Sequence, residues 1–192
     1  MYNKDFFINI INIIFLALAQ VFIFNHINFL GSYQPYIYIV FVLFYPPYAN
    51  RYLFIFLAFL LGLSIDILEY TGGINAFALT FVAYYRDSII KLLFGKANYD
   101  MEYFKFSSFS VSQWVFYIAI IILFHHCILL LLENFKFTGL LNVLTNALIS
   151  SGLTFIFVII YKILFKNKIT IWKNWSLYTH WSYLLFFFSL VA

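Results

Sequence analysis

Long apolar runs separated by short polar stretches dominate this chain. Most of the runs are close to 20 residues long, and one is about half that length. A membrane-spanning α-helix needs roughly 20 apolar residues, and backbone in lipid must satisfy its own hydrogen bonds. The pattern therefore predicts an all-α integral membrane protein, a six-transmembrane-helix bundle with helices over 6–24, 36–45, 52–68, 74–94, 111–132 and 140–165.

The second run is too short to cross a bilayer as a simple helix. It extends from Tyr36 to Tyr45, between Pro35 and the pair Pro46-Pro47. A helix of that length crosses only about half of the hydrocarbon core. We therefore expect either that this helix continues upstream or that the bilayer thins around it.

The basic residues are distributed unequally between the two sides that six crossings define. Of the 11 Lys and Arg residues, only Lys136 falls on the side of loops 25–34, 69–73 and 133–139. The others fall on the opposite side, which also holds the longest loop, 95–110. Because cytoplasmic loops are enriched in Lys and Arg, the sequence predicts a multi-pass membrane protein with both termini cytoplasmic.

Composition supports this class and limits the alternatives. The chain of 192 residues is 65% hydrophobic and only 9% charged, whereas soluble domains are roughly 25% charged. The net charge of +4 belongs to residues beside apolar runs, so it indicates topology and lipid contact and predicts no nucleic-acid binding. We expect one membrane domain over 1–168 and an aromatic-rich cytoplasmic or interfacial tail over 169–192, with a seventh span as the alternative for the tail.

The first run has a competing interpretation as a signal peptide. Lys4 precedes it, and Ala17-Leu18-Ala19 has the small-residue spacing of a cleavage site. The apolar run continues beyond this point to Phe24, which favours an uncut spanning helix.

The most informative motif lies at the junction of the third and fourth predicted helices. Ala58, Gly62 and Asp66 recur every four residues and share one face, where small residues allow close helix approach. Gly72-Gly73 permits a sharp return of the chain, and Asn75-Ala76 begins the next helix. Asn75 is expected to cap that helix or to bond back to Asp66. We interpret the motif as a polar clasp for a helical hairpin, with a proton or substrate role for Asp66 as the alternative.

Three further groups of polar residues lie within apolar runs. Arg86 is expected to extend toward headgroups near the cytoplasmic end of its helix, or else to form a buried ion pair or dock a partner, and Asp87 is expected to point elsewhere. His125 and His126 are adjacent, diverge around the helix and are expected to be packing histidines without a metal. A polar stripe for helix contact, or for lining a cavity, recurs every fourth residue at Asn142, Asn146, Ser150 and Thr154.

The order of these motifs resembles one membrane-protein family. The pattern is Gly62-Leu63-x-x-Asp66, then Gly72-Gly73-x-Asn75-Ala76, then the aromatic-Arg pair Tyr85-Arg86, with the short Pro-flanked run upstream. It resembles the rod shape-determining protein MreD, most closely the Bacteroidetes branch. The similarity is clearest from Pro35 to Phe94. Many relatives have His at the position of Asn75 and Pro at the position of Asp87.

The resemblance implies a non-enzymatic function without a cofactor. MreD proteins are inner-membrane components of the peptidoglycan elongation complex, and they associate with MreC and through it with the MreB filament. Their fold is similar to the six-helix substrate-binding subunits of energy-coupling-factor vitamin transporters. A solute-binding transporter subunit is therefore the alternative function. Those subunits carry an Ala-x-x-x-Ala docking pattern on the first helix, whereas this chain has Ala17-Leu18-Ala19.

Overall fold

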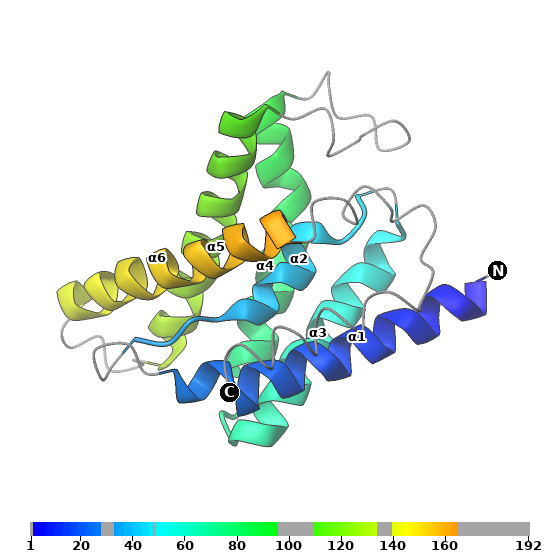
Figure 1. Cartoon of the computed structure of the whole chain (residues 1–192), viewed down its shortest axis with the longest axis horizontal. Coiled ribbons are helices and arrows are strands. Elements are labelled where there is room, and N and C mark those ends of the chain that lie inside the picture. The colour runs from blue at the N-terminus through cyan, green and yellow to red at the C-terminus, as the bar shows by residue number, and fades with distance from the viewer. Residues whose placement is uncertain (1, 28–32, 48, 96–109, 134–139, 165–192) are drawn as a thin grey trace.

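The computed structural model describes residues 2–27, 33–47, 49–95, 110–133 and 140–164 (Figure 1). Two short 3-10 helices, η1 (Phe24–His26) and η2 (Ile37–Ile39), interrupt the α-helical architecture. The α-helices are α1 (Tyr2–Phe22), α2 (Val40–Phe44), α3 (Arg51–Glu69), α4 (Ile74–Phe94), α5 (Val111–Glu133) and α6 (Leu140–Leu164). The predicted boundaries of the five long helices agree with these within a few residues.

Four helices in the described part of the chain are long and apolar enough to cross a membrane. They cover Asn9–His26, Arg51–Glu69, Val111–Glu133 and Leu141–Ile163. α4 is as long as α1 but is not among these four, and it contains Arg86, Asp87 and Lys91. The chain is therefore a helical multi-pass membrane protein in which α4 carries charge within its length.

The second predicted helix differs most from expectation. α2 has only five residues, and the helix does not continue upstream, because Tyr33–Tyr36 is non-helical. Pro35 explains this, since it lacks an N–H donor and disfavours the helical conformation in the residue before it. A non-helical residue advances up to about 3.3 Å, compared with 1.5 Å in a helix. We call residues 33–45 the central crossing, because this segment passes through the buried core of the bundle.

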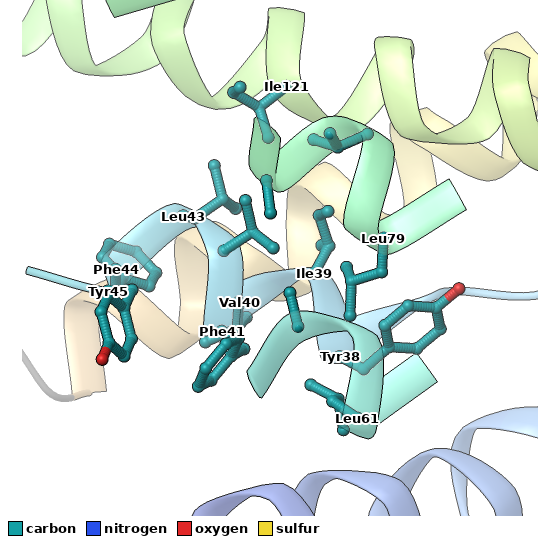
Figure 2. Packing of buried hydrophobic residues seen from close by; sticks show 14 of the residues in the cluster. Tyr38, Ile39, Val40, Phe41, Leu43, Phe44, Tyr45, Leu61, Leu79 and Ile121 are labelled. Carbon is teal, nitrogen blue, oxygen red and sulfur yellow. The ribbon is translucent and has the colours of Figure 1, made fainter. Parts of the chain in front are cut away.

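The central crossing lies in the core of the bundle. Tyr38, Ile39, Val42 and Leu43 have no exposed surface. Figure 2 shows side chains of this segment packed among those of Leu61, Leu79 and Ile121, which come from α3, α4 and α5. α3 and α4 form an antiparallel hairpin on one side of the segment, while α1 and α6 contact η2 (Figure 1). The chain thus fills the interior of its own bundle.

Charged side chains separate between the two ends of the long helices. Arg51 begins α3 and lies 3.8 Å from Asp87 on α4, and Lys162 near the end of α6 lies 4.0 Å over the ring of Trp114 near the start of α5. α3 and α5 end instead with acidic residues, Glu69 and Glu133. Lys136, the tail over 169–192 and all but the ends of loop 95–110 lie outside the described residues.

Candidate functional site

Asp66 joins the two helices of the α3–α4 hairpin. Its Oδ1 accepts hydrogen bonds from the Thr71 hydroxyl and from the backbone N–H and side-chain amide of Asn75, both at 3.0 Å. Its Oδ2 accepts the backbone N–H of Ala76 at 2.7 Å. These N–H groups belong to the first turn of α4, which Gly73 cannot cap with a side chain. Asp66 therefore caps α4 from α3, and its negative charge faces the positive end of the helix dipole.

The hairpin brings the two helix backbones unusually close. A Cβ atom on Gly62 would lie 2.5 Å from the Cα of Ala76 and 2.7 Å from the carbonyl oxygen of Asn75. Ala58, one turn earlier, has no exposed surface. The predicted stripe of Ala58, Gly62 and Asp66 therefore faces α4, as expected for a clasp that fixes two helices. We call Gly62, Asp66, Thr71, Asn75 and Ala76 the hairpin clasp.

Three residues with positive φ turn the chain between the helices. Gly72 and Gly73 have φ values of 71° and 99°, a conformation that Gly adopts at little cost. Tyr70, with φ 58°, is the left-handed C-cap of α3 and is 94% exposed. The two glycines were predicted to make the turn, whereas Tyr70 has no sequence signal for this conformation.

A directed chain of hydrogen bonds leads from the hairpin clasp to the core. The Asn75 amide donates to Asp66, so its oxygen is left to accept the Tyr38 hydroxyl at 2.7 Å. The hydroxyl oxygen of Tyr38 lies 3.0 Å from Nε2 of His125. Since the Tyr38 proton is given to Asn75, Nε2 of His125 must be the donor in that contact. One chain of polar groups thus connects α3, α4, η2 and α5.

Side chains from α1 and α6 satisfy the backbone where the central crossing is not helical. The Gln20 amide donates to the carbonyl of Pro35 at 3.0 Å and accepts the N–H of Ile37 at 2.8 Å. The Thr154 hydroxyl oxygen accepts the N–H of Tyr36 at 3.0 Å. Non-helical backbone at membrane depth is tolerated only where protein or water replaces the missing partners. Gln20 and Thr154 supply them here.

Arg86 likewise provides hydrogen-bond partners for backbone groups, at the C-terminal end of the central crossing. Its Nη1 donates to the carbonyls of Val42 and Tyr45 at 3.1 and 2.8 Å, and its guanidinium lies 4.1 Å from the centre of the Phe54 ring. The Tyr117 hydroxyl donates to the carbonyl of Leu43 at 3.1 Å. These carbonyls are the unpaired C-terminal acceptors of a short helix, where a positive charge is favourable.

The expectation that Arg86 extends to the headgroups was therefore wrong. The residue is only 2% exposed, and the carbonyls of α2 hold its guanidinium inside the bundle. This position also leaves no surface through which Arg86 could dock a partner. The unpaired end of α2 attracts the cation inward, and this attraction was not visible before the break in the second helix was known.

Asp87 also lies differently from the prediction, which pointed it away from Arg86. Its Oδ1 is 3.5 Å from Nη2 of Arg86, and its Oδ2 is 3.8 Å from Nε of Arg51. Arg51 also donates to the carbonyl of Tyr84 at 3.1 Å. Asp87 is buried between two guanidinium groups, so it compensates the charge that α4 carries inside the bundle.

The two histidines have different environments, although both are fully buried. Nδ1 of His126 lies 2.9 Å from the carbonyl of Ile122, and its Nε2 lies 3.1 Å from the Thr154 hydroxyl. His125 contacts Tyr38 through Nε2, while its Nδ1 has no hydrogen-bond partner in the part of the chain that the structure describes. Within the described ranges, no three His, Cys, Asp or Glu side chains are grouped in a way that could hold a metal ion.

The predicted stripe on α6 divides into two parts. Ser150 and Thr154 are buried, and Thr154 bonds to His126 and to the central crossing. Asn142 is exposed and Asn146 is half-buried. The inner half of the stripe is a helix contact as predicted, whereas the outer half is not part of that contact.

Sequence reasoning missed most of the residues that support the central crossing. Gln20 was not predicted to bond to the second run, and Tyr38 and Tyr117 were not distinguished from the many other aromatic residues. A buried amide within an apolar run is a signal that could have identified Gln20. A tyrosine whose hydroxyl caps a distant carbonyl has no comparable signal.

Comparison of the chain with protein-family models, with curated proteins and with solved structures finds no match. What the described polar groups can do is therefore judged from their own geometry. In the hairpin clasp and in the central crossing, these polar groups bond to one another and to backbone groups. This arrangement holds the helices and the central crossing in place.

Proposed function

We propose that this protein is a non-enzymatic scaffold of the bacterial peptidoglycan elongation complex, similar to MreD, which holds an MreC-like partner in the inner membrane. The residues that carry the resemblance support this proposal. Gly62, Asp66, Asn75 and Ala76 are also the residues of the hairpin clasp. The motif of the family therefore coincides with a brace between two helices, as a scaffold requires.

The observation that carries the proposal is the filled interior of the bundle. The central crossing occupies this interior with fully buried side chains, including Tyr38, Val42 and Leu43. In the polar stripe on α6 that could have lined a solute site, Ser150 and Thr154 are buried, and Thr154 bonds to Tyr36 and His126. A solute-binding transporter subunit, the alternative function, needs a concave site with polar groups available to the ligand.

The distribution of charge supports an orientation with both termini cytoplasmic. The end of the bundle with Arg51, Lys91 and Lys162 would face the cytoplasm, and the end with Glu69 and Glu133 would face outward. Single cysteines at Ser32 and Asn98, in a Cys127→Ser background, test this orientation. An impermeant thiol reagent added outside should label only the first, and labelling of the second would reverse the assignment.

The function is tested by depletion of the protein from its own cells. Loss of an elongation scaffold should round or widen the cells and mislocalise the MreC-like partner, while uptake of vitamins continues at its normal rate. Expression of the wild-type chain should restore both, and a stable but non-assembling variant should not. Normal cell width and partner localisation, together with lost uptake of one vitamin, would refute the scaffold and favour the transporter.

A further inference from the structure

The outward surface of α3 carries a tyrosine at each end. Tyr52 is 84% exposed, and Tyr70, the residue that caps the helix, is 94% exposed. The exposed residues between them are all apolar, namely Phe56, Phe59, Ile67 and Leu68. The two tyrosines are 18 residues apart, or about 27 Å along a helix. This length is close to that of the hydrocarbon core of a bilayer, which is about 30 Å thick.

Tyrosine is suited to the boundary between acyl chains and water. Its ring is apolar and its hydroxyl forms hydrogen bonds, and Tyr and Trp are enriched where membrane proteins meet the lipid headgroups. Tyr70 also has a φ of 58° at a helix end, a place where Gly is the common residue because it adopts this conformation at little cost. A side chain that is almost fully exposed gains little within the fold to offset that cost. Contact with the headgroup layer supplies a reason for Tyr at this position.

α5 repeats the pattern with polar residues near its two ends. Gln113 and Glu133 are exposed and lie 20 residues apart, which corresponds to about 30 Å of helix. The exposed residues between them are again apolar: Val115, Phe116, Ile120, Leu123 and Leu131. α3 and α5 therefore present apolar surfaces of nearly the same length, as expected for helices that cross one hydrocarbon layer.

α4 begins inside this layer. Its first turn is bonded to Asp66 through the backbone N–H and the side chain of Asn75. Asp66 lies one turn before Tyr70, so the start of α4 is about 6 Å deeper than that residue. The remaining distance to the level of Tyr52 is about 21 Å, which about 14 residues of helix span. α4 has 21 residues, so its end extends beyond the level of Tyr52.

Contacts at the start of α3 place the same boundary on α4. Arg51, next to Tyr52, donates to the carbonyl of Tyr84 and lies 3.8 Å from Asp87. The exposed surface of α4 changes character at this level, from the apolar Phe77 to the hydroxyl-bearing Tyr84, Tyr85 and Ser88. Both observations put the boundary near residue 88, six residues before α4 ends.

We propose that the hydrocarbon layer of the bilayer is bounded by Tyr52 on one side and Tyr70 on the other, with both rings among the lipid headgroups, and that residues 89–94 of α4 lie outside this layer. Lys91, one of the charges that set α4 apart from the four spanning helices, then lies outside the hydrocarbon. Leu92, which is 84% exposed, lies beside headgroups and water. This placement depends neither on the scaffold function nor on which end of the bundle is cytoplasmic.

Spin labels on single cysteines measure these depths in liposomes that contain the full chain. In a Cys127→Ser background, cysteines replace Tyr52, Phe59, Tyr70 and Leu92, which are all exposed. Power-saturation EPR compares collisions with oxygen, which is concentrated among the acyl chains, with collisions with a water-soluble nickel complex. The label at Phe59 should lie about 10 Å deeper than the label at Tyr52 and about 16 Å deeper than the label at Tyr70. The label at Leu92 should be the most accessible to nickel, and a label there as deep as that at Phe59 would overturn the proposal.

Bilayer thickness provides a second test, which needs no label. The thermal unfolding midpoint of the wild-type chain, measured in phosphatidylcholine bilayers of increasing acyl-chain length, should be highest where the hydrocarbon is about 27 Å thick, because mismatch in either direction costs free energy. Tyr70→Leu lengthens the apolar surface and should shift this optimum to thicker bilayers. Phe59→Leu is the control, because it replaces an exposed aromatic residue within the layer and should leave the optimum unchanged. The same optimum in all three chains would show that Tyr70 does not mark the boundary.

Discussion

The hairpin clasp and the central crossing both provide hydrogen-bond partners for buried backbone groups, but the partners are separated by very different distances along the chain. In both regions, buried backbone groups at helix ends take their partners from side chains. In the hairpin clasp, Asp66 reaches N–H groups only 9 and 10 residues away. In the central crossing, the partners lie 17 residues away for Gln20, 44 and 41 for Arg86, 74 for Tyr117 and 118 for Thr154.

This difference in sequence separation determines how much of the fold each region stabilises. The hairpin clasp can form as soon as α3 and α4 meet, because all of its members belong to that hairpin. The backbone groups of the central crossing have all of these hydrogen-bond partners only when α1, α4, α5 and α6 have assembled around it. A change in the hairpin clasp should therefore weaken one helix pair, whereas a change at the central crossing should weaken the whole bundle.

The largest effect is expected from Arg86→Met. Met keeps most of the apolar volume but leaves the carbonyls of Val42 and Tyr45 without a donor and Asp87 without its closer cation. Loss of one partner from such a buried charge network should lower the free energy of unfolding by about 3–5 kcal/mol. Arg51→Met is the control, because that side chain is 39% exposed and exposed ion pairs contribute at most about 1 kcal/mol. Equal stability of the two variants, measured in nanodiscs, would show that Arg86 does not support the crossing.

An intermediate effect is expected where the hairpin helices touch. Gly62→Ala places a Cβ atom against the backbone of Ala76, which cannot move aside as a side chain would. Overpacking of this kind should cost about 1–3 kcal/mol and lower the abundance of the protein in the membrane. Gly152→Ala is the matched control, since its Cβ meets nothing within 4 Å. If the two variants accumulate equally, the helices of the hairpin are not in close contact.

Asp66→Asn should weaken the hairpin clasp to a similar extent. The amide keeps one acceptor oxygen but replaces the other with an NH2 group, so the N–H of Asn75 or Ala76 loses its partner. An unpaired buried donor should cost about 1–3 kcal/mol, and local unfolding should appear as faster hydrogen exchange at the start of α4. Exchange as slow as in the wild type would show that the carboxylate does not cap α4. Full stability combined with lost cell-shape function would favour a charge-dependent role for Asp66.

The smallest effect is expected from Tyr38→Phe, which removes the connection between the two regions. The hydroxyl contacts Asn75 and His125, and hydrogen bonds between membrane helices contribute about 0.6 kcal/mol each on average. The variant should unfold as one unit at a slightly lower denaturant concentration. Tyr52→Phe, at an 84% exposed position, is the control. A double-mutant cycle with Asn75→Ala should give a positive coupling energy, and additive effects would argue against the bond.

The contrast between the regions also explains what could be predicted from the sequence. The long helices follow from apolar runs, and the hairpin clasp follows from small residues and Asp66 at helical spacing, because each signal and its cause lie within a few turns. The prediction even included the bond between Asn75 and Asp66. The length problem of the second run was also recognised from its prolines.

How the bundle accommodates the short second run could not be predicted from the sequence. The helix does not continue upstream; instead, Gln20 and Thr154 replace the missing backbone partners of non-helical chain. Arg86 was placed at the headgroups for the same reason: nothing within one turn of it indicates that the carbonyls of Val42 and Tyr45 are unpaired. Contacts over such separations follow from the assembled fold, and local periodicity does not contain them.

Affinity purification of the tagged chain from native membranes, with identification of the copurifying proteins, tests the central claim most directly. A scaffold whose interior is filled by its own chain should recover an MreC-like protein with a periplasmic coiled coil and other elongation proteins. Recovery should fall with Gly62→Ala, which disturbs the hairpin clasp, but not with Gly152→Ala. Recovery of an ATPase module and a bound vitamin, without elongation proteins, would contradict the account.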